Sequence, residues 1–216
     1  LAKALIQTQQ FDDALAATNR ALGIKSQLVG TSDIAIAETL EIQGQVLQRK
    51  GAYSSARSDL ERAVNIRERT NPNHPDAAAT FMLLGAQFWF EGDLAQARSF
   101  LTRAVSIAEV GLRPDHPEIA SCLKILAIPV QDLGDLDGAR ALQQRALEIA
   151  EHSLGSEHPL VAGYLNDLAN TLLLQGEYSA ARSLYERALL TQEKRFGPNH
   201  SEVATTVYNL AVLNAK

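Results

Sequence analysis

The sequence predicts an all-α protein made of tandem helix-turn-helix repeats, and three regularities support this prediction. First, four of the five histidines recur every 42 residues, at His74, His116, His158 and His200. Second, a glycine stands 18 residues after Asp33, His74, His116 and His158, at Gly51, Gly92, Gly134 and Gly176. We call Asp33 and the four histidines the frame positions. Third, each repeat carries one Arg-Ala-Leu/Val triplet, which begins at Arg20, Arg62, Arg103, Arg145 or Arg187.

The apolar pattern inside one repeat predicts two helices. After His158, apolar residues recur at spacings of three and four, at Val161, Leu165, Leu168, Ala169 and Leu172. The same spacing follows Gly176, at Ala181, Tyr185, Ala188 and Leu189. A stripe of this kind is typical of an amphipathic helix that buries one side. Each repeat is therefore predicted to be a helical hairpin.

The residues at the predicted helix ends have physical reasons to be there. Three of the frame histidines precede a proline, and proline suits the first turn of a helix, where its missing N–H is not needed. The histidine before it then occupies the cap position, and Asp33 takes that place in the first unit. Gly176 and its equivalents permit the left-handed backbone conformation that ends the first helix.

The period divides the chain into one array over residues 1–216. A partial unit spans 1–33, four units span about 34–74, 75–116, 117–158 and 159–200, and a partial terminal helix spans 201–216. Arrays of this kind need terminal units with a polar outer face, and neither end has that pattern. We therefore expect the chain to be a fragment of a longer protein.

Composition argues against two classes of partner. The formal net charge is −5 and lysine forms no run, so neither nucleic acid nor an anionic membrane surface is expected to bind. The chain has one cysteine, which excludes an internal disulfide framework. No apolar run approaches the roughly 20 residues that a membrane span needs. A cytoplasmic location is the resulting expectation.

The order glycine, aromatic residue or leucine, alanine, tyrosine or leucine, alanine resembles the tetratricopeptide repeat. The 42-residue period and the connector Leu154-Gly155-x-x-His158-Pro159 look like the longer version found in kinesin light chains and many bacterial signalling proteins. The resemblance covers the whole chain. It implies a right-handed superhelix of helix pairs, with the first helix of each pair lining a concave surface that holds a protein or peptide.

On that surface, the resemblance also implies which residues face a partner. Kinesin light chain repeats carry Leu-Asn-Asn-Leu-Ala there, and this chain has Leu165-Asn166-Asp167-Leu168-Ala169. The other repeats depart from the motif and become more apolar. The candidate partner-binding residues are Glu41, Gln45, Met82, Trp89, Phe90, Lys124, Ile128, Asn166, Asn170, Leu173 and Tyr208. For Trp89, a place in the ordinary core, or beneath a neighbouring segment of the intact protein, is the alternative.

The sequence predicts no catalytic site, metal site or cofactor, and the protein is not expected to be an enzyme. Equivalent histidines in successive units lie on the order of 10 Å or more apart, too far for shared metal coordination. Cys122 lies on a predicted helix, and its side chain is expected to be packed against other residues. Repeated arginines such as Arg57 and Arg140 could bind an acidic partner, but pairing with carboxylates such as Glu61 is favoured.

Three functions remain open at this point. The leading one is a scaffold that binds a protein or peptide, or another domain of its own chain. The second is a regulatory or sensor region of a larger multidomain enzyme or signalling ATPase. The third is self-association through the open ends of the array.

Pro129 breaks the pattern inside a predicted first helix, at the place of Thr171 in the next repeat. Proline removes one backbone hydrogen bond there and its ring clashes with the carbonyl four residues back, at a cost of about 3 kcal/mol or a kink. We expect a tolerated defect at this point.

Overall fold

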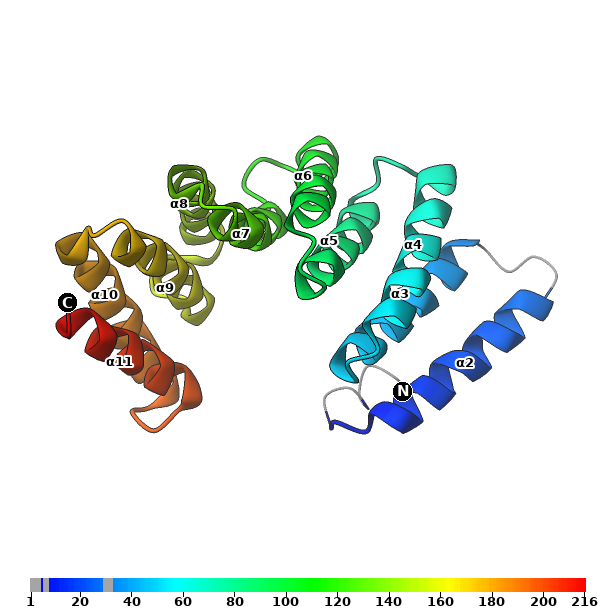
Figure 1. Cartoon of the computed structure of the whole chain (residues 1–216), viewed down its shortest axis with the longest axis horizontal. Helices are drawn as coiled ribbons and strands as arrows, with labels where there is room; N and C mark the ends of the chain where they lie inside the picture. The colour runs from blue at the N-terminus through cyan, green and yellow to red at the C-terminus, as the bar shows by residue number, and fades with distance from the viewer. Residues whose placement is uncertain (1–4, 6–7, 29–32) are drawn as a thin grey trace. The chain divides into compact units, whose positions relative to one another are not determined.

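The structure is a computed structural model that describes residue 5 and residues 8–28 and 33–216 (Figure 1). These residues form helices joined by short turns and contain no strand. The helices are α2 (Phe11–Gln27), α3 (Asp33–Arg49), α4 (Tyr53–Thr70), α5 (Pro75–Phe90), α6 (Leu94–Gly111), α7 (Pro117–Asp132), α8 (Leu136–Leu154), α9 (Pro159–Leu174), α10 (Tyr178–Phe196) and α11 (Ser201–Asn214). The predicted all-α fold of tandem helical hairpins is confirmed.

The helices alternate between two roles. We call α3, α5, α7, α9 and α11 the first helices, because each begins at a frame position or directly after it. We call α2, α4, α6, α8 and α10 the second helices. The frame histidines cap the first helices as predicted. The Nδ1 atom of each accepts a hydrogen bond from the backbone N–H two residues later, at 3.3 Å in His74 and 3.2 Å in His158. Asp33 is the first residue of α3, and the residues directly before it lie outside the described ranges.

The repeated glycines end the first helices in the predicted conformation. Gly51, Gly92, Gly134 and Gly176 have φ values of 75°, 83°, 88° and 80°. The N–H of Gly176 donates to the Leu173 carbonyl, and the next N–H reaches back to Leu172, which closes the helix end. A side chain at these positions would strain the backbone, so the glycine is required by the turn.

Small residues let the two helices of a hairpin approach closely. The repeated second-helix alanines Ala56, Ala97, Ala139 and Ala181 are all 0% exposed. On the first helices, Gly44 and Gly85 lie against Leu60 and Leu101, and an added Cβ at Gly85 would stand 2.6 Å from Leu101 Cγ. In these two hairpins, a leucine side chain of the second helix is therefore set directly against a glycine of the first.

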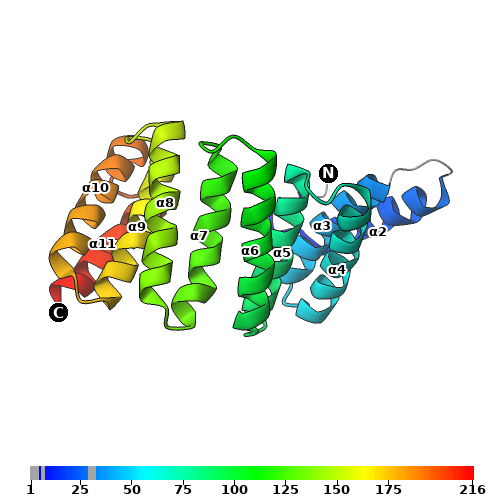
Figure 2. The ribbon, with the colours of Figure 1, turned by 90° about the horizontal axis from the view of Figure 1, so that it is seen from above.

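The described contacts divide the chain into two compact units, Leu1–Gly111 and Leu112–Lys216. In the first, each of α2 to α6 packs against the next, and α3 also touches α5; in the second, α7 to α11 do the same, with α7 touching α9 and α9 touching α11. Figure 2 shows α7 and α8 lying side by side in this way. The first helices thus form a row in each unit. A single array over 1–216 stays a prediction.

Two further expectations concern single elements. Helix α7 runs from Pro117 to Asp132 with Pro129 buried inside it, so the proline does not end the helix. Beyond it, the N–H of Leu133 donates to the Pro129 carbonyl at 3.0 Å. Within the described residues, no helix combines the length and the apolar character that crossing a membrane requires.

Candidate partner-binding faces of the first helices

The candidate residues lie on the first helices of both units. Glu41 and Gln45 are on α3, and Met82, Trp89 and Phe90 are on α5. In the second unit, Lys124 and Ile128 are on α7, Asn166, Asn170 and Leu173 on α9, and Tyr208 on α11. We refer to the rows of first helices, α3 and α5 in one unit and α7, α9 and α11 in the other, as the two first-helix faces.

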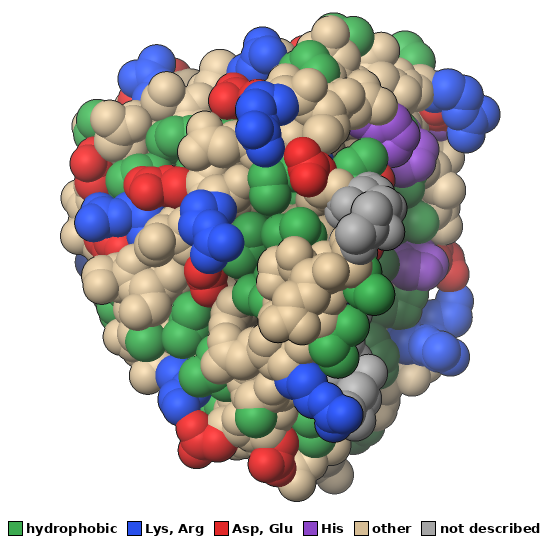
Figure 3. All heavy atoms as spheres, turned by 90° about the vertical axis from the view of Figure 1, so that its right-hand side faces the viewer, with side chains coloured by type: hydrophobic (Ala, Val, Ile, Leu, Met, Phe, Trp, Pro, Cys, Tyr) green, Lys and Arg blue, Asp and Glu red, His purple; other side chains and the backbone are tan. Residues whose placement is uncertain are grey.

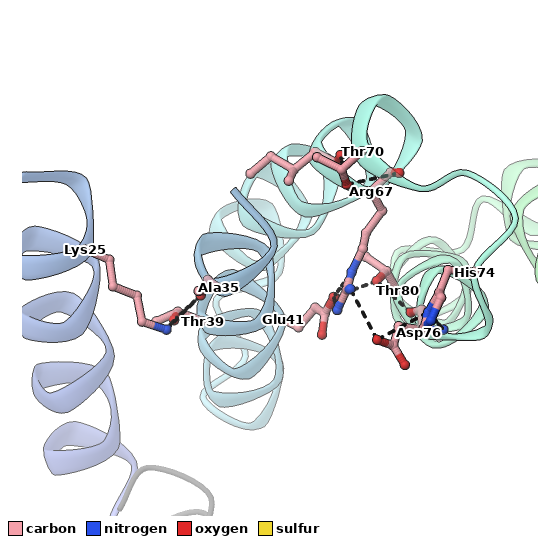
Figure 4. A network of polar contacts seen from close by, with 10 residues as sticks. Lys25, Ala35, Thr39, Glu41, Arg67, Thr70, His74, Asp76 and Thr80 are labelled. Atoms are coloured by element: carbon pink, nitrogen blue, oxygen red, sulfur yellow. Dashed lines mark hydrogen bonds and ion pairs between the residues drawn. The ribbon is translucent and has the colours of Figure 1, made fainter. Parts of the chain in front are cut away.

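Glu41 is held by a buried ion pair that joins three helices (Figure 4). Its Oε1 atom accepts hydrogen bonds from Arg67 of α4 at 3.1 and 3.2 Å and from the Thr80 hydroxyl of α5 at 2.6 Å. Arg67 also lies 3.5 Å from Asp76. The side chains of Arg67 and Glu41 are only 5% and 14% exposed, so most of this charge is shielded from water. We call this group the polar clasp of the first unit.

The second unit has a polar clasp at the equivalent repeat positions. Asn166 of α9 donates from Nδ2 to the Thr206 hydroxyl of α11 at 2.8 Å, and Thr206 donates to Gln192 Oε1 of α10 at 2.7 Å. Asn166 is buried, and no described residue donates a hydrogen bond to its Oδ1 atom. The predicted partner-binding asparagine therefore joins neighbouring first helices through its amide nitrogen.

The residues of the second helices that complete the clasps were not among the predicted site residues. Arg67 and Gln192 stand five residues after Arg62 and Arg187, where the intervening repeats have Ala108 and Ala150. Lys25 has the same place in α2, and its Nζ donates to the Ala35 carbonyl and the Thr39 hydroxyl, both at 2.7 Å. The sequence signal that could have identified these residues is a polar side chain at a repeat position where the two intervening repeats have alanine.

Aromatic rings gather at the end of α5 in the first unit. Phe90 is half exposed and stacks on Tyr53 of α4, with ring centroids 6.0 Å apart and an interplanar angle of 6°. Trp89 lies against Phe90 with the centroids 5.1 Å apart. Trp89, Met82 and Gln45 are all half-buried. The structure thus brings Trp89 and Phe90 together at a partly exposed aromatic edge.

In the second unit, Lys124 links α7 to α9. Its Nζ lies 2.9 Å from Asp167 Oδ2 and 5.1 Å from the centre of the Tyr164 ring. Gly163 leaves the space for this side chain, since a Cβ there would stand 3.3 Å from Nζ. Lys124 also borders a hollow of about 350 Å³ with Leu160, which lies at the start of α9. The surface beside Lys124 is consequently concave.

The other candidates in this unit differ in exposure. Asn170 is half-buried and accepts a hydrogen bond from the Tyr185 hydroxyl at 2.5 Å, and burial raises the pKa of Tyr185 to about 12. Leu173 is half-buried and Ile128 is 37% exposed. Tyr208 is 68% exposed on α11. Among the candidate residues of this unit, Ile128 and Tyr208 therefore have the most exposed apolar side chains.

Charged side chains outside the clasps pair locally. Arg57 lies 2.7 Å from Glu91 and 3.9 Å from Glu61, and Arg140 lies 2.6 Å from Glu177. This agrees with the favoured interpretation of the repeated arginines as partners of carboxylates. On the face shown in Figure 3, basic and acidic side chains are interspersed with hydrophobic ones.

Residues with metal-binding or nucleophilic chemistry are scattered. In the part of the chain that the structure describes, no three His, Cys, Asp or Glu side chains gather into a group that could hold a metal ion. Cys122 is buried on α7.

Comparison with solved structures identifies the fold. The crystal structure of BtubC (BKLC) from P. vanneervenii is 20% identical, covers 95% of this chain and 83% of its own, and has a TM-score of 0.83. A putative kinesin light chain with nearly identical TPR-like repeats from Podosopora anserina is 24% identical, with 91% and 93% covered and a TM-score of 0.76. The apo form of RapI is 19% identical, with 94% and 54% covered and a TM-score of 0.72.

The sequence itself identifies the family. No curated protein matches the chain. The family model for the tetratricopeptide repeat matches residues 35–110, 130–189 and 165–216, which together make up well over half of the sequence. These ranges include α5, α9 and α11 and most of α3, and the helical hairpins agree with the match. The chain belongs to the tetratricopeptide repeat family.

Proposed function

We propose that this protein is a non-catalytic interaction module that binds a protein or peptide partner along its first-helix faces. Tetratricopeptide arrays generally act as protein-interaction scaffolds, whose stacked repeats present extended surfaces. The partner is a peptide, a helix or another domain of the same parent chain. Fold alone does not assign a function, so the proposal depends on what these faces carry.

One observation carries the proposal: large apolar side chains are exposed on the first helices. Tyr208 is 68% exposed, Phe90 51% and Ile128 37%. Aromatic side chains of this kind anchor partners at interfaces because they bury a large area at low conformational cost. Charged groups such as Lys124 of α7 and Asp167 of α9 also lie on first helices and would surround the anchors.

The clasps support the same proposal. They connect first helices to one another, Glu41 to Thr80 in one unit and Asn166 to Thr206 in the other, at 2.6 and 2.8 Å. Helices that are held in a fixed register present their exposed side chains in a fixed arrangement, which lowers the entropic cost of binding. We therefore assign the clasps a role in pre-organising the faces.

The test is selection of peptides from a displayed library on the immobilised chain, followed by affinity measurement of one selected peptide by fluorescence anisotropy. Tyr208→Ala, or Phe90→Ala for a peptide bound to the first unit, should weaken binding at least about tenfold, which is the range of an interface hot spot. Trp89→Ala should also weaken a peptide at the first unit while helicity, measured by circular dichroism, is retained.

The chain offers a matched control. Leu190 lies on the second helix α10 and is 69% exposed, almost the same as Tyr208. Leu190→Ala removes a similarly exposed apolar side chain from a second helix, and it should leave the affinity unchanged. Equal weakening by Leu190→Ala and Tyr208→Ala would contradict binding on the first-helix face.

A further inference from the structure

Three helices of the second unit, α9, α10 and α11, pack against one another and border the hollow beside Lys124 (Figure 1). The hollow has a volume of about 350 Å³, and we call it the α9–α11 hollow. Its lining includes Leu160 and Gly163 of α9, Gln192 and Phe196 of α10, and Glu202 of α11. The two residues from α9 are three positions apart and the two from α10 are four apart, so each pair lies on one side of its helix.

Gln192 is a buried polar group at the edge of this hollow. It is 1% exposed, and its Oε1 atom accepts a hydrogen bond from the Thr206 hydroxyl at 2.7 Å. Because that hydroxyl accepts from Asn166 Nδ2, its own proton is directed at Gln192, which fixes the orientation of the Gln192 amide. Among the described residues, none accepts a hydrogen bond from Gln192 Nε2. The polar clasp therefore leaves a buried N–H donor, which is costly until a ligand satisfies it.

The charges around the hollow favour a neutral ligand. Lys124 lies 2.9 Å from Asp167, so these two charges offset each other. Glu202 is exposed and forms no ion pair with a described residue. An added carboxylate would meet the charge of Glu202. An added ammonium would meet the charge of Lys124 and would give Gln192 Nε2 no acceptor.

Glu202 lies close enough to Gln192 for one small group to reach both. It precedes Thr206 by one turn of α11, which is about 5.4 Å along the helix axis. Thr206 contacts both the Glu202 carbonyl and the Gln192 side chain. A planar carboxamide spans such a gap, because its oxygen can accept from Gln192 Nε2 while its N–H donates to the Glu202 carboxylate. Neither a carboxylate nor an ammonium can do both.

The remaining wall of the hollow is apolar. Leu160 is 63% exposed and occupies a repeat position at which α5, α7 and α11 carry an acidic residue. Phe196 is 41% exposed, and its ring stacks on His200 with the centroids 4.5 Å apart. These side chains can cover the methylene groups of a ligand whose polar end lies at Gln192 and Glu202.

We propose that the α9–α11 hollow recognises the side-chain carboxamide of a glutamine or asparagine in the partner. The inference rests on the proposed function, because α9 and α11 are first helices, and it adds the chemical group that the second unit selects. In the bound state, the amide oxygen of the ligand accepts from Gln192 Nε2 and its nitrogen donates to Glu202. The methylene groups of the ligand lie against Leu160 and Phe196.

The probe for the test is N-acetyl-glutamine N-methylamide, added to the whole chain and followed by NMR through the side-chain amide signals of Gln192. The matching derivatives of glutamate, lysine and alanine serve as comparisons. The glutamine derivative should shift the signals saturably. It should bind at least about fivefold more tightly than the glutamate and lysine derivatives, which each leave a hydrogen-bonding group unpaired. The alanine derivative has only main-chain amides and should not bind.

Variants of the chain locate the site. Glu202→Gln changes an exposed residue, so the chain keeps its fold, and it should reverse the preference so that the glutamate derivative binds more tightly. Glu118→Gln is the matched control, because it makes the same change at the same repeat position of α7, and it should keep the preference for glutamine. Gln192→Met removes the buried donor and should abolish binding, followed through the backbone amide of Gly163.

The outcomes separate this proposal from the proposed function. Tyr208→Ala should weaken a selected peptide of the second unit and leave the affinity of the glutamine derivative unchanged. Absent binding of the glutamine derivative, equal affinity for the glutamate derivative, or an unchanged preference in Glu202→Gln would overturn the proposal. Equal shifts with the alanine derivative would overturn it in favour of main-chain amides. A chain that still binds selected peptides after such a result would keep the proposed function and lose only the carboxamide site.

Discussion

At the scale of single residues, the polar clasps show how a repeat protein can use one position in two ways. Glu41, Arg67 and Thr80 form a charged clasp, and Asn166, Gln192 and Thr206 form a neutral one at the same repeat positions. The repeat between α5 and α7 has Met82, Ala108 and Cys122 instead. The repeat can therefore have either polar or apolar side chains at these three positions.

The charged clasp predicts a specific pattern of stability. Arg67→Met removes the cation and leaves the buried Glu41 carboxylate without its partner, which should cost about 3–5 kcal/mol of unfolding free energy. Glu41→Met added to Arg67→Met removes the stranded charge, and Thr80 keeps its hydrogen bond to the Asp76 carbonyl. The double variant should therefore recover at least half of the loss in urea unfolding. A double variant less stable than Arg67→Met would contradict this role.

Tyr185 predicts a loss of stability at alkaline pH. Burial raises its pKa to about 12 from an ordinary value of 10.0, so the folded state favours the neutral phenol. The free energy of unfolding therefore keeps its full value below about pH 10. It falls by about 2 kcal/mol as the pH rises toward 12. Tyr185→Phe should lower stability at pH 7 by about 1 kcal/mol, through loss of the bond to Asn170, and should flatten the decline above pH 10. Parallel declines in both proteins would contradict the prediction.

At the scale of elements, the helices could be predicted from the sequence because their signals are local. His74 and Gly92 mark the beginning and end of α5 without reference to any other helix. The positions of Glu41 and Asn166 on first helices were predictable for the same reason. Their contacts were not, because they depend on which residues of a neighbouring repeat, here Thr80 and Thr206, reach across.

Two glycines inside helices predict opposite effects of the same substitution. Gly85→Ala places a Cβ 2.6 Å from Leu101 Cγ and should destabilise the chain by about 1–3 kcal/mol through overpacking. Gly163→Ala meets only the flexible end of Lys124, so the gain in helix propensity should stabilise by up to about 1 kcal/mol. Thermal unfolding of the two variants checks the pair, and a stabilising Gly85→Ala would show that α5 and α6 are less closely packed than the structure has them.

At the scale of the whole molecule, packing is local in sequence. Each helix of α7 to α11 packs against the next, and α2 to α6 do so in the other unit. In repeat proteins, stability is the sum of such neighbour interactions rather than the property of one central core. Within each unit, the helices that pack together are therefore neighbours in sequence.

It follows that each unit should fold alone. Residues 112–216 expressed by themselves should have a helical circular dichroism spectrum and unfold cooperatively in urea. Residues 1–111 should do the same. A fragment 112–216 without helical structure would show that its stability depends on the other unit.

The central claim is that a partner lies along the first helices, and site-specific crosslinking tests it most directly. A photoreactive benzoylphenylalanine would replace either Tyr208 of α11 or Leu190 of α10, which are 68% and 69% exposed. With a selected peptide bound to the second unit, irradiation should yield the crosslinked species from position 208 and only background from position 190. Crosslinking from position 190 and none from position 208 would contradict the account.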